Sequence, residues 1–138
     1  MPAKDIYHEA VKLALIKDGW TVTDDPLYVP WAGRDLFIDF GAEKFLSAEK
    51  NGRKIAVEVK SFVGLSEIED LKNALGQYVL YRNALALTEP DRELFLAIRE
   101  AVFDKLFNEP DAQFLLKNEN LRIIVFSAAE EKIAKWIN

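Results

Sequence analysis

The sequence of 138 residues contains no cysteine, one histidine and one methionine. The chain therefore cannot form a disulfide framework, a structural zinc site or a cysteine nucleophile. No apolar run approaches the roughly 20 residues that span a bilayer. The N-terminal segment MPAKDIYHEAVKLALIKDGW is charged throughout and lacks a small-residue cleavage site. These absences predict a cytoplasmic protein without a signal peptide and without a membrane partner.

The composition predicts one folded domain over residues 1–138. Half of the residues are hydrophobic and 12% are aromatic, which is enough to fill a core. The net charge of -5 argues against a polybasic protein that binds nucleic acid through bulk positive charge. A local site for nucleic acid stays compatible with this charge.

Hydrophobic periodicity and turn signals predict a mixed α/β fold. The expected helices cover residues 4–18, 66–85, the second half of 93–107, and a short segment after Pro110. The expected strands cover LFIDF, FLSAEK and RKIAVEVKSF, the first half of 93–107, and the closing segments RIIVF and KIAKWI. Asn51-Gly52 is typical of a type I′ turn and predicts a hairpin, and Ser66-Glu67-Ile68-Glu69 predicts a capping box.

The first helix is expected to bury a stripe of apolar residues. Ile6, Ala10, Leu13 and Ala14 recur at helical spacing, and Val11 and Leu15 widen the stripe. The single histidine, His8, is interpreted as a surface or capping residue of this helix.

The segment Glu58-Val59-Lys60 could carry chemistry. Residues two apart on a strand share a face, so the carboxylate of Glu58 and the ammonium of Lys60 lie side by side. The hairpin can bring Asp39 beside them, and two converging carboxylates suit Mg²⁺ or Mn²⁺. Glu9 could add a carboxylate, and Gln77, one helical turn from Tyr81, could line the site.

An alternative without chemistry exists for these residues. An acid-x-Lys triplet is weakly specific, and Glu58 with Lys60 could be a solvated strand face forming cross-strand ion pairs. This alternative suits Asp39 less well, because an acid inside the apolar run LFIDF is costly to bury without a partner or a metal ion.

The order of these motifs resembles the PD-(D/E)xK nuclease superfamily. Asp39 matches the first acid of its motif, and Glu58 and Lys60 match its (D/E)xK part. Glu9 corresponds to the carboxylate of the first helix, and Gln77 to the polar residue of the following helix. The resemblance implies a restriction-endonuclease-like mixed β-sheet flanked by helices, with catalytic Asp39, Glu58, Lys60, Glu9 and Gln77 and a metal ion on Asp39 and Glu58. Ile38 stands where the motif has proline, which leaves Asp35 as a rival first acid.

Over its whole length the chain resembles the XisH family of cyanobacterial proteins. The resemblance is carried by IDFGAEKFLSAEKNGRKIAVEVKSF, GQYVLYRNAL and KIAKWI. It implies control of excision of the fdxN element during heterocyst differentiation, without implying that the protein itself cleaves DNA. A Mg²⁺-dependent DNA endonuclease activity is what the superfamily resemblance implies. The implied partners are DNA, an XisI-type companion and a recombinase, and a homodimer is compatible with it. Two alternatives are a non-catalytic regulatory subunit paired with the companion, and a toxin-like nuclease that the companion neutralises.

Overall fold

The computed structural model describes residues 5–44 and 52–138. Its helices are α1 (His8–Lys17), α2 (Glu67–Thr88), α3 (Glu100–Leu106) and α4 (Pro110–Asn118). Its strands are β1 (Thr21–Asp24), β2 (Leu27–Trp31), β3 (Arg34–Ile38), β4 (Phe40–Lys44), β5 (Arg53–Val59), β6 (Arg92–Arg99), β7 (Ile123–Ser127) and β8 (Lys132–Ile137).

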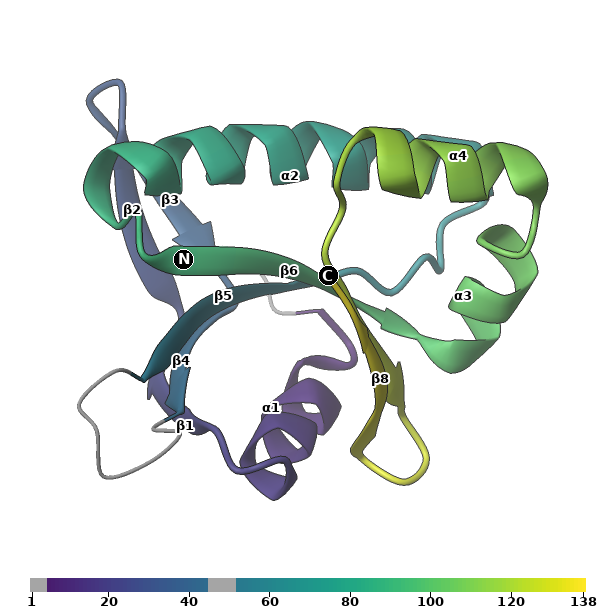
Figure 1. Cartoon of the computed structure of the whole chain (residues 1–138), viewed down its shortest axis with the longest axis horizontal. Helices are drawn as coiled ribbons and strands as arrows, with labels where there is room; N and C mark the ends of the chain where they lie inside the picture. The colour runs from purple at the N-terminus through teal and green to yellow at the C-terminus, as the bar shows by residue number, and fades with distance from the viewer. Residues whose placement is uncertain (1–4, 45–51) are drawn as a thin grey trace.

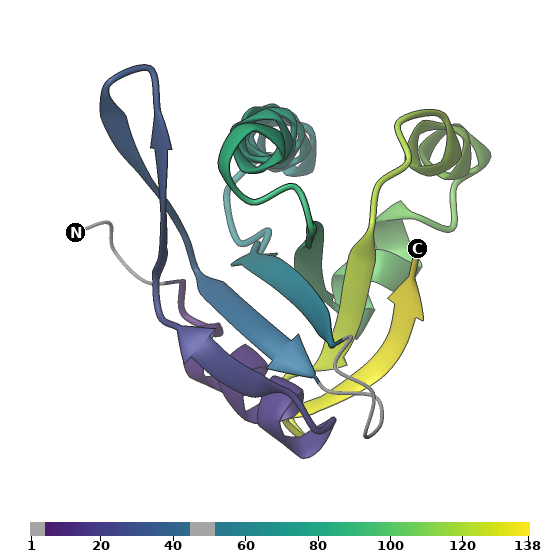
Figure 2. The same ribbon diagram turned by 60° about the vertical axis from the view of Figure 1, so that its left-hand side comes forward.

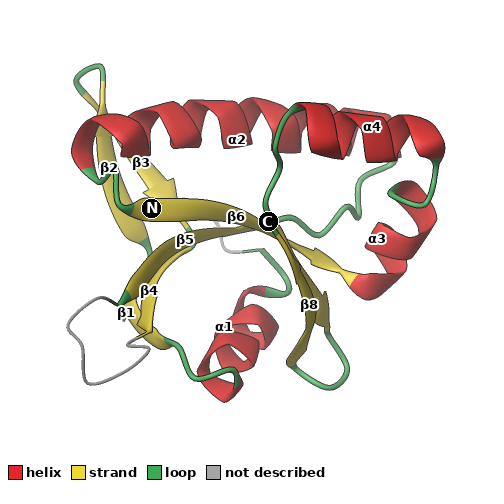
Figure 3. Ribbon diagram, in the orientation of Figure 1, coloured by secondary structure: helices red, strands yellow, loops and turns green. Residues whose placement is uncertain are grey.

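The central element is a mixed sheet in the order β1-β4-β5-β6-β7-β8. Its three middle strands, β5, β6 and β7, run parallel, while β4 and β1 on one side and β8 on the other are antiparallel to their neighbours. Parallel neighbours require crossover connections, which α2 supplies between β5 and β6, and α3 with α4 between β6 and β7. The fold class is therefore mixed α/β, with helices flanking a mixed sheet (Figures 1 and 3).

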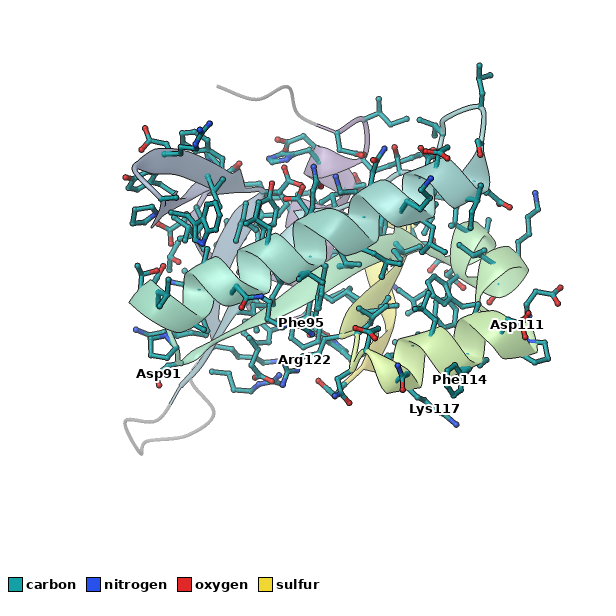
Figure 4. All side chains as sticks on the ribbon, turned by 90° about the horizontal axis from the view of Figure 1, so that it is seen from above. Asp91, Phe95, Asp111, Phe114, Lys117 and Arg122 are labelled. Atoms are coloured by element: carbon teal, nitrogen blue, oxygen red, sulfur yellow. The ribbon has the colours of Figure 1, made fainter. Side chains whose placement is uncertain are left out.

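Helices cover both faces of this sheet. On one face α1 packs over a core that includes Phe40, Val57 and Phe95. On the other face α2, α3 and α4 pack over a core that includes Tyr78, Leu96 and Ile123. Figure 4 looks onto α2 and α4, and Phe114 of α4 is exposed there. Within the described parts of the chain, no helix is both long and apolar enough to cross a membrane.

The apolar run LFIDF is expected from the sequence to form one strand, but the structure divides it between two strands. Its first part belongs to β3, which among the described residues pairs with β2 alone, in a separate hairpin that rises beside α2 (Figure 2). Its last residue, Phe40, begins β4 in the main sheet. Asp39 lies between the two strands, so the acid is placed where the chain passes from one sheet to the other. Burial of Ile38 against α2 and of Phe40 against α1 explains the break, because the two side chains enter different cores.

Most other local predictions are confirmed. The strand followed by a helix in residues 93–107 is observed as β6 and α3, and the helix after Asn108 is observed as α4. Ser66 is the N-cap of α2, and its hydroxyl accepts a hydrogen bond from Glu69 N at 3.3 Å. β4 and β5 pair as antiparallel neighbours, but the expected arm FLSAEK and residue Asn51 of the expected turn lie outside the described residues.

The predicted buried face of the first helix needs correction. The first helix begins at His8 and buries Val11, Ala14 and Leu15, while Ile6 precedes it and Leu13 is exposed. The interpretation of His8 as a surface residue is wrong, because only 3% of it is exposed.

Candidate active site

Asp39 and Glu58 meet where the pairing of β4 with β5 ends. The last pair of the ladder is Phe40 with Val57, so Asp39 is opposite Glu58 at the next position. At this position carboxylate oxygens accept the backbone N–H groups in place of carbonyl oxygens of the paired strand. Asp39 N donates to Glu58 Oε1 at 3.1 Å, and Val59 N donates to Asp39 Oδ2 at 2.8 Å. Each carboxylate therefore has one oxygen held by a backbone N–H group and one oxygen free of the backbone.

Lys60 lies on the same side of the strand as Glu58. Its Nζ is 3.5 Å from Glu58 Oε2, and its backbone N donates to Ala97 O, which extends the β5–β6 pairing. The alternative of a solvated strand face is not supported, because Glu58 is only 8% exposed.

The environment of Glu58 favours its protonated form. Burial raises the pKa of Glu58 to about 8, and the charge of Asp39 acts in the same direction while Lys60 opposes it. One ammonium group is therefore too little to keep the buried Glu58 carboxylate fully ionised at neutral pH. A further cation at this position would favour the ionised form.

A histidine–aspartate pair borders the carboxylates, and sequence reasoning missed it. His8 Nε2 is 2.7 Å from Asp25 Oδ1, and Lys12 Nζ is 3.1 Å from Asp25 Oδ2. Because an ionised carboxylate can only accept, Nε2 is the protonated nitrogen of this pair. Burial alone would raise the pKa of Asp25, but hydrogen bonds from Lys12 and His8 outweigh it and lower that pKa.

The second ring nitrogen of His8 faces the acidic pair. His8 Nδ1 is buried, has no hydrogen-bond partner among the described residues, and lies 3.6 Å from Asp39 Oδ1. The ring also packs on Phe40, with centroids 4.3 Å apart. Helical spacing could have identified His8, since residues 8, 11 and 15 share one helix face. No local signal points to Asp25, which approaches only through the tertiary fold.

Two predicted candidates lie away from this cluster. Glu9 is exposed and forms no hydrogen bond or ion pair with Asp39, Glu58 or Lys60 in the described structure. Its neighbour His8 occupies the face of α1 that Glu9 was expected to use. Asp35, the rival first acid, is exposed on β3 in the separate hairpin, where a hydrogen bond with it raises the pKa of Tyr28.

Gln77 and Tyr81 approach the cluster from α2. Gln77 lines the same pocket as Lys60, and its buried Oε1 has no hydrogen-bond partner among the described residues. Burial raises the pKa of Tyr81 to about 12, with further contributions from the charges of Glu58 and Asp39. Tyr81 thus remains a neutral hydroxyl at physiological pH.

The site has fewer acidic ligands than a dedicated metal cage. Over residues 5–44 and 52–138, no group of three or more histidine and acidic side chains is arranged to hold a metal ion. The converging acids are Asp39 and Glu58 alone, so an ion bound to them would need its other ligands from elsewhere. Mg²⁺ accepts this arrangement, because it binds through one or two carboxylates and keeps several waters or phosphate oxygens.

Replacing His8 with alanine is expected to destabilise the protein by about 2 kcal/mol, because it removes a buried ring and the hydrogen bond that satisfies Asp25. The matched control is Glu9→Ala, one residue along the same helix and exposed, which should change stability by no more than about 0.5 kcal/mol. Urea unfolding of both variants measures the difference. Equal effects would contradict the placement of His8 in the core of the site.

The fold and the site together define a mixed α/β protein with a pair of carboxylates, one of them buried, and a lysine at the end of a central strand. Residues 1–134 match the model of the family described as XisH protein. The chain therefore belongs to the XisH family.

Two solved structures are similar to the chain over nearly its whole length. An XisH family protein from Nostoc punctiforme PCC 73102 is 36% identical, with a TM-score of 0.88 over 97% of this chain and 100% of that chain. An fdxN element excision controlling factor protein from Anabaena variabilis is 40% identical, with a TM-score of 0.86 over 98% of this chain and 100% of that chain. A comparison with curated proteins finds no match.

Proposed function

We propose that this chain acts on DNA in the excision of a DNA element, as a divalent-metal-dependent endonuclease of the PD-(D/E)xK type. The observation that carries the proposal is the convergence of Asp39, Glu58 and Lys60 at the end of β5. The role in excision is supported by the 40% identity to the Anabaena variabilis protein, which is described as an fdxN element excision controlling factor. The restriction-endonuclease-like assignment is supported by the order of the elements that carry the three residues.

The residues fit a metal ion. Asp39 Oδ1 and Glu58 Oε2 are the oxygens that the backbone leaves free, and both carboxylates are otherwise held in place. Burial and the charge of Asp39 raise the pKa of Glu58, so a cation beside the two acids would favour the ionised form of Glu58. Asp39 and Glu58 would hold Mg²⁺ or Mn²⁺, which lowers the pKa of a bound water and offsets negative charge on a phosphodiester.

The remaining residues of the site would bind and orient the substrate. The Lys60 ammonium, beside Glu58, can hold an attacking water or neutralise charge that develops on the phosphate. Gln77 Oε1 can accept a hydrogen bond from water or from a nucleotide. Tyr81, kept protonated by its raised pKa, can donate through its hydroxyl.

Calorimetric titration with Mn²⁺ tests the metal site. At pH 8.5, where Glu58 is largely ionised, we expect the wild type to bind Mn²⁺ and Glu58→Ala to bind it at least about tenfold more weakly. Asp35→Ala is the matched control, because Asp35 is an exposed acid in the separate hairpin, and it should bind like the wild type. Equal binding of Mn²⁺ by wild type and Glu58→Ala, or no binding by either, would overturn the metal-site proposal.

A regulatory subunit is the second candidate function, and an apolar groove on α2 favours it. The groove, of about 490 Å³, lies between Trp31 of the hairpin and Val79, Leu80 and Leu87 of α2. Leu87 is 77% exposed, which is unusual for an apolar residue beside others of its kind. An XisI-type companion or a recombinase could bind there without any chemistry at Asp39.

An excision assay in cells separates the two functions. If Asp39→Ala and Lys60→Ala support normal excision while Leu87→Asp does not, the regulatory function is correct and the endonuclease proposal fails. The opposite pattern supports the endonuclease.

A further inference from the structure

A polar pocket of about 340 Å³ lies beside Lys60, and Asp39 is not among the residues that line it. Lys60, Ser61 and Phe62 form one wall at the end of β5, and Asn73 and Gln77 of α2 form another. The proposed function uses Lys60 and Gln77 only at the rim of this space. The pocket is therefore placed to receive whatever part of the substrate lies next to the phosphate at the carboxylates.

The charges around the pocket argue against a second phosphate. Asp5 and Asp70 line it together with Lys60, so two carboxylates face one ammonium group. The carboxylates also hold the loop: Asp5 Oδ2 accepts from Ser61 N at 3.1 Å, and Asp70 Oδ2 accepts from Gly64 N at 2.9 Å. A neutral ligand with polar edges suits this lining better than an anion does.

Two side-chain amides and an aromatic ring are among the groups that such a ligand would meet. Asn73 and Gln77 are four residues apart on α2, so they lie on the same side of the helix. The Gln77 Oε1 atom is buried without a hydrogen-bond partner among the described residues. Asparagine and glutamine amides match the N6 and N7 edge of adenine, and Phe62 adds an apolar wall. Phe62 itself has a φ of 54°, a conformation that bulky residues adopt rarely and mostly at functional sites.

Apolar side chains project into solvent beside the same pocket. Val63 lines it, and Val63, Leu65 and Ile68 are all exposed on the loop from β5 to the first turn of α2. Leu65 is fully exposed. Proteins that distort DNA insert apolar side chains of this kind between base steps, and enzymes that extrude a base hold it in a polar pocket nearby.

We propose that the pocket receives an unpaired nucleobase, with adenine preferred, while Leu65 occupies the space that the base leaves in the stack. The inference rests on the proposed function, because it requires a DNA strand at the carboxylates. Asn73 and Gln77 contact the edge of the base. The protein thereby acts on DNA at sites where a base is unpaired or readily extruded.

Binding to duplexes that differ only in one unpaired base tests the proposal. Each duplex carries adenine, cytosine or thymine opposite an abasic position, and affinity is measured by fluorescence anisotropy in Ca²⁺, which binds oxygen ligands as Mg²⁺ does. We expect unpaired adenine to be bound at least about tenfold more tightly than unpaired cytosine or thymine. Asn73→Ala and Asn73→Asp should both reduce this preference to less than about threefold, since neither keeps the amide.

Matched variants outside the pocket are the controls. Asn83→Ala replaces an exposed asparagine whose amide donates to Val79 O, and it should keep the preference for adenine. Leu65→Ala should weaken binding to every duplex with an unpaired base, whereas Phe114→Ala, at an exposed apolar residue of α4, should not.

The outcomes separate this inference from the proposed function. DNA binding by the wild type without a preference among the three bases, or a preference that Asn73→Ala retains, overturns the base pocket and leaves the proposed function standing. Absence of DNA binding under all these conditions overturns both. If the wild type prefers adenine and only the Asn73 variants lose this preference, the base pocket is supported.

Discussion

Replacing Lys60 with methionine is expected to lower the rate of metal-dependent DNA cleavage by a factor of about 100 to 1000, which is typical for the loss of one preorganised electrostatic contact. The reason is the position of the ammonium group. Its Nζ is 3.5 Å from Glu58 Oε2 and the side chain is 22% exposed, so water screens its charge only weakly. Methionine keeps most of the apolar stem, so the substitution removes charge with little loss of packing.

Lys54→Met is the matched control for this prediction. Lys54 lies on the same strand, but its side chain is 52% exposed and its Nζ pairs with Glu43 at 3.7 Å, away from the carboxylates. Cleavage by Lys54→Met should stay within about threefold of the wild type, as expected for a screened surface charge. Similar rates for Lys60→Met and Lys54→Met would contradict the role of Lys60. No cleavage by the wild type with Mg²⁺ or Mn²⁺ would favour the regulatory subunit.

The stability of the metal-free protein is expected to fall as pH rises between about 4.5 and 8. Burial and the charge of Asp39 raise the pKa of Glu58 from 4.5 to about 8, so the folded state binds a proton that the unfolded state has already lost in this range. The free energy of unfolding therefore decreases as pH rises from about 4.5 to about 8. Below this range Glu58 does not affect it, and above pH 8 the contribution of Glu58 is fully lost. The shift corresponds to at most about 5 kcal/mol at 1.36 kcal/mol per pKa unit.

Glu58→Gln should remove most of this pH dependence and make the protein more stable than the wild type at pH 9. Glu43→Gln is the control, because Glu43 lies on the adjacent strand β4 and is only half-buried, and it should keep the wild-type profile. Urea unfolding from pH 4 to pH 9 measures all three proteins. A flat profile for the wild type would show that Glu58 is ionised at little cost in the folded state.

A divalent cation should counteract the same loss. Millimolar Mn²⁺ is expected to stabilise the wild type at pH 8.5 more than at pH 5, because the cation competes with the proton for Glu58. Glu58→Gln should show little of this stabilisation. Stabilisation by Mn²⁺ that is equal at both pH values would place the bound ion away from Glu58.

Much of the fold follows from local sequence patterns. Ser66 caps α2 because its hydroxyl accepts a hydrogen bond from a free N–H group in the first turn. This interaction needs only residues close in sequence. The division of residues 93–107 into a strand and a helix follows from an apolar run and then helical spacing. The shared face of Glu58 and Lys60 follows from the two-residue period of a strand, and the ion pair at 3.5 Å agrees with it.

The sequence by itself thus determined the mixed α/β class and one half of the site. Only the tertiary structure decided the other half. Asp39 joins Glu58 because the chain changes sheets there, and His8 meets Asp25 because α1 packs against β1, the strand that Asp25 follows. Such contacts depend on which distant segments pair and on how much water they exclude, and no local pattern encodes either quantity. The same burial raises the pKa of Glu58, turning an ordinary acid into a group that is only partly ionised at neutral pH.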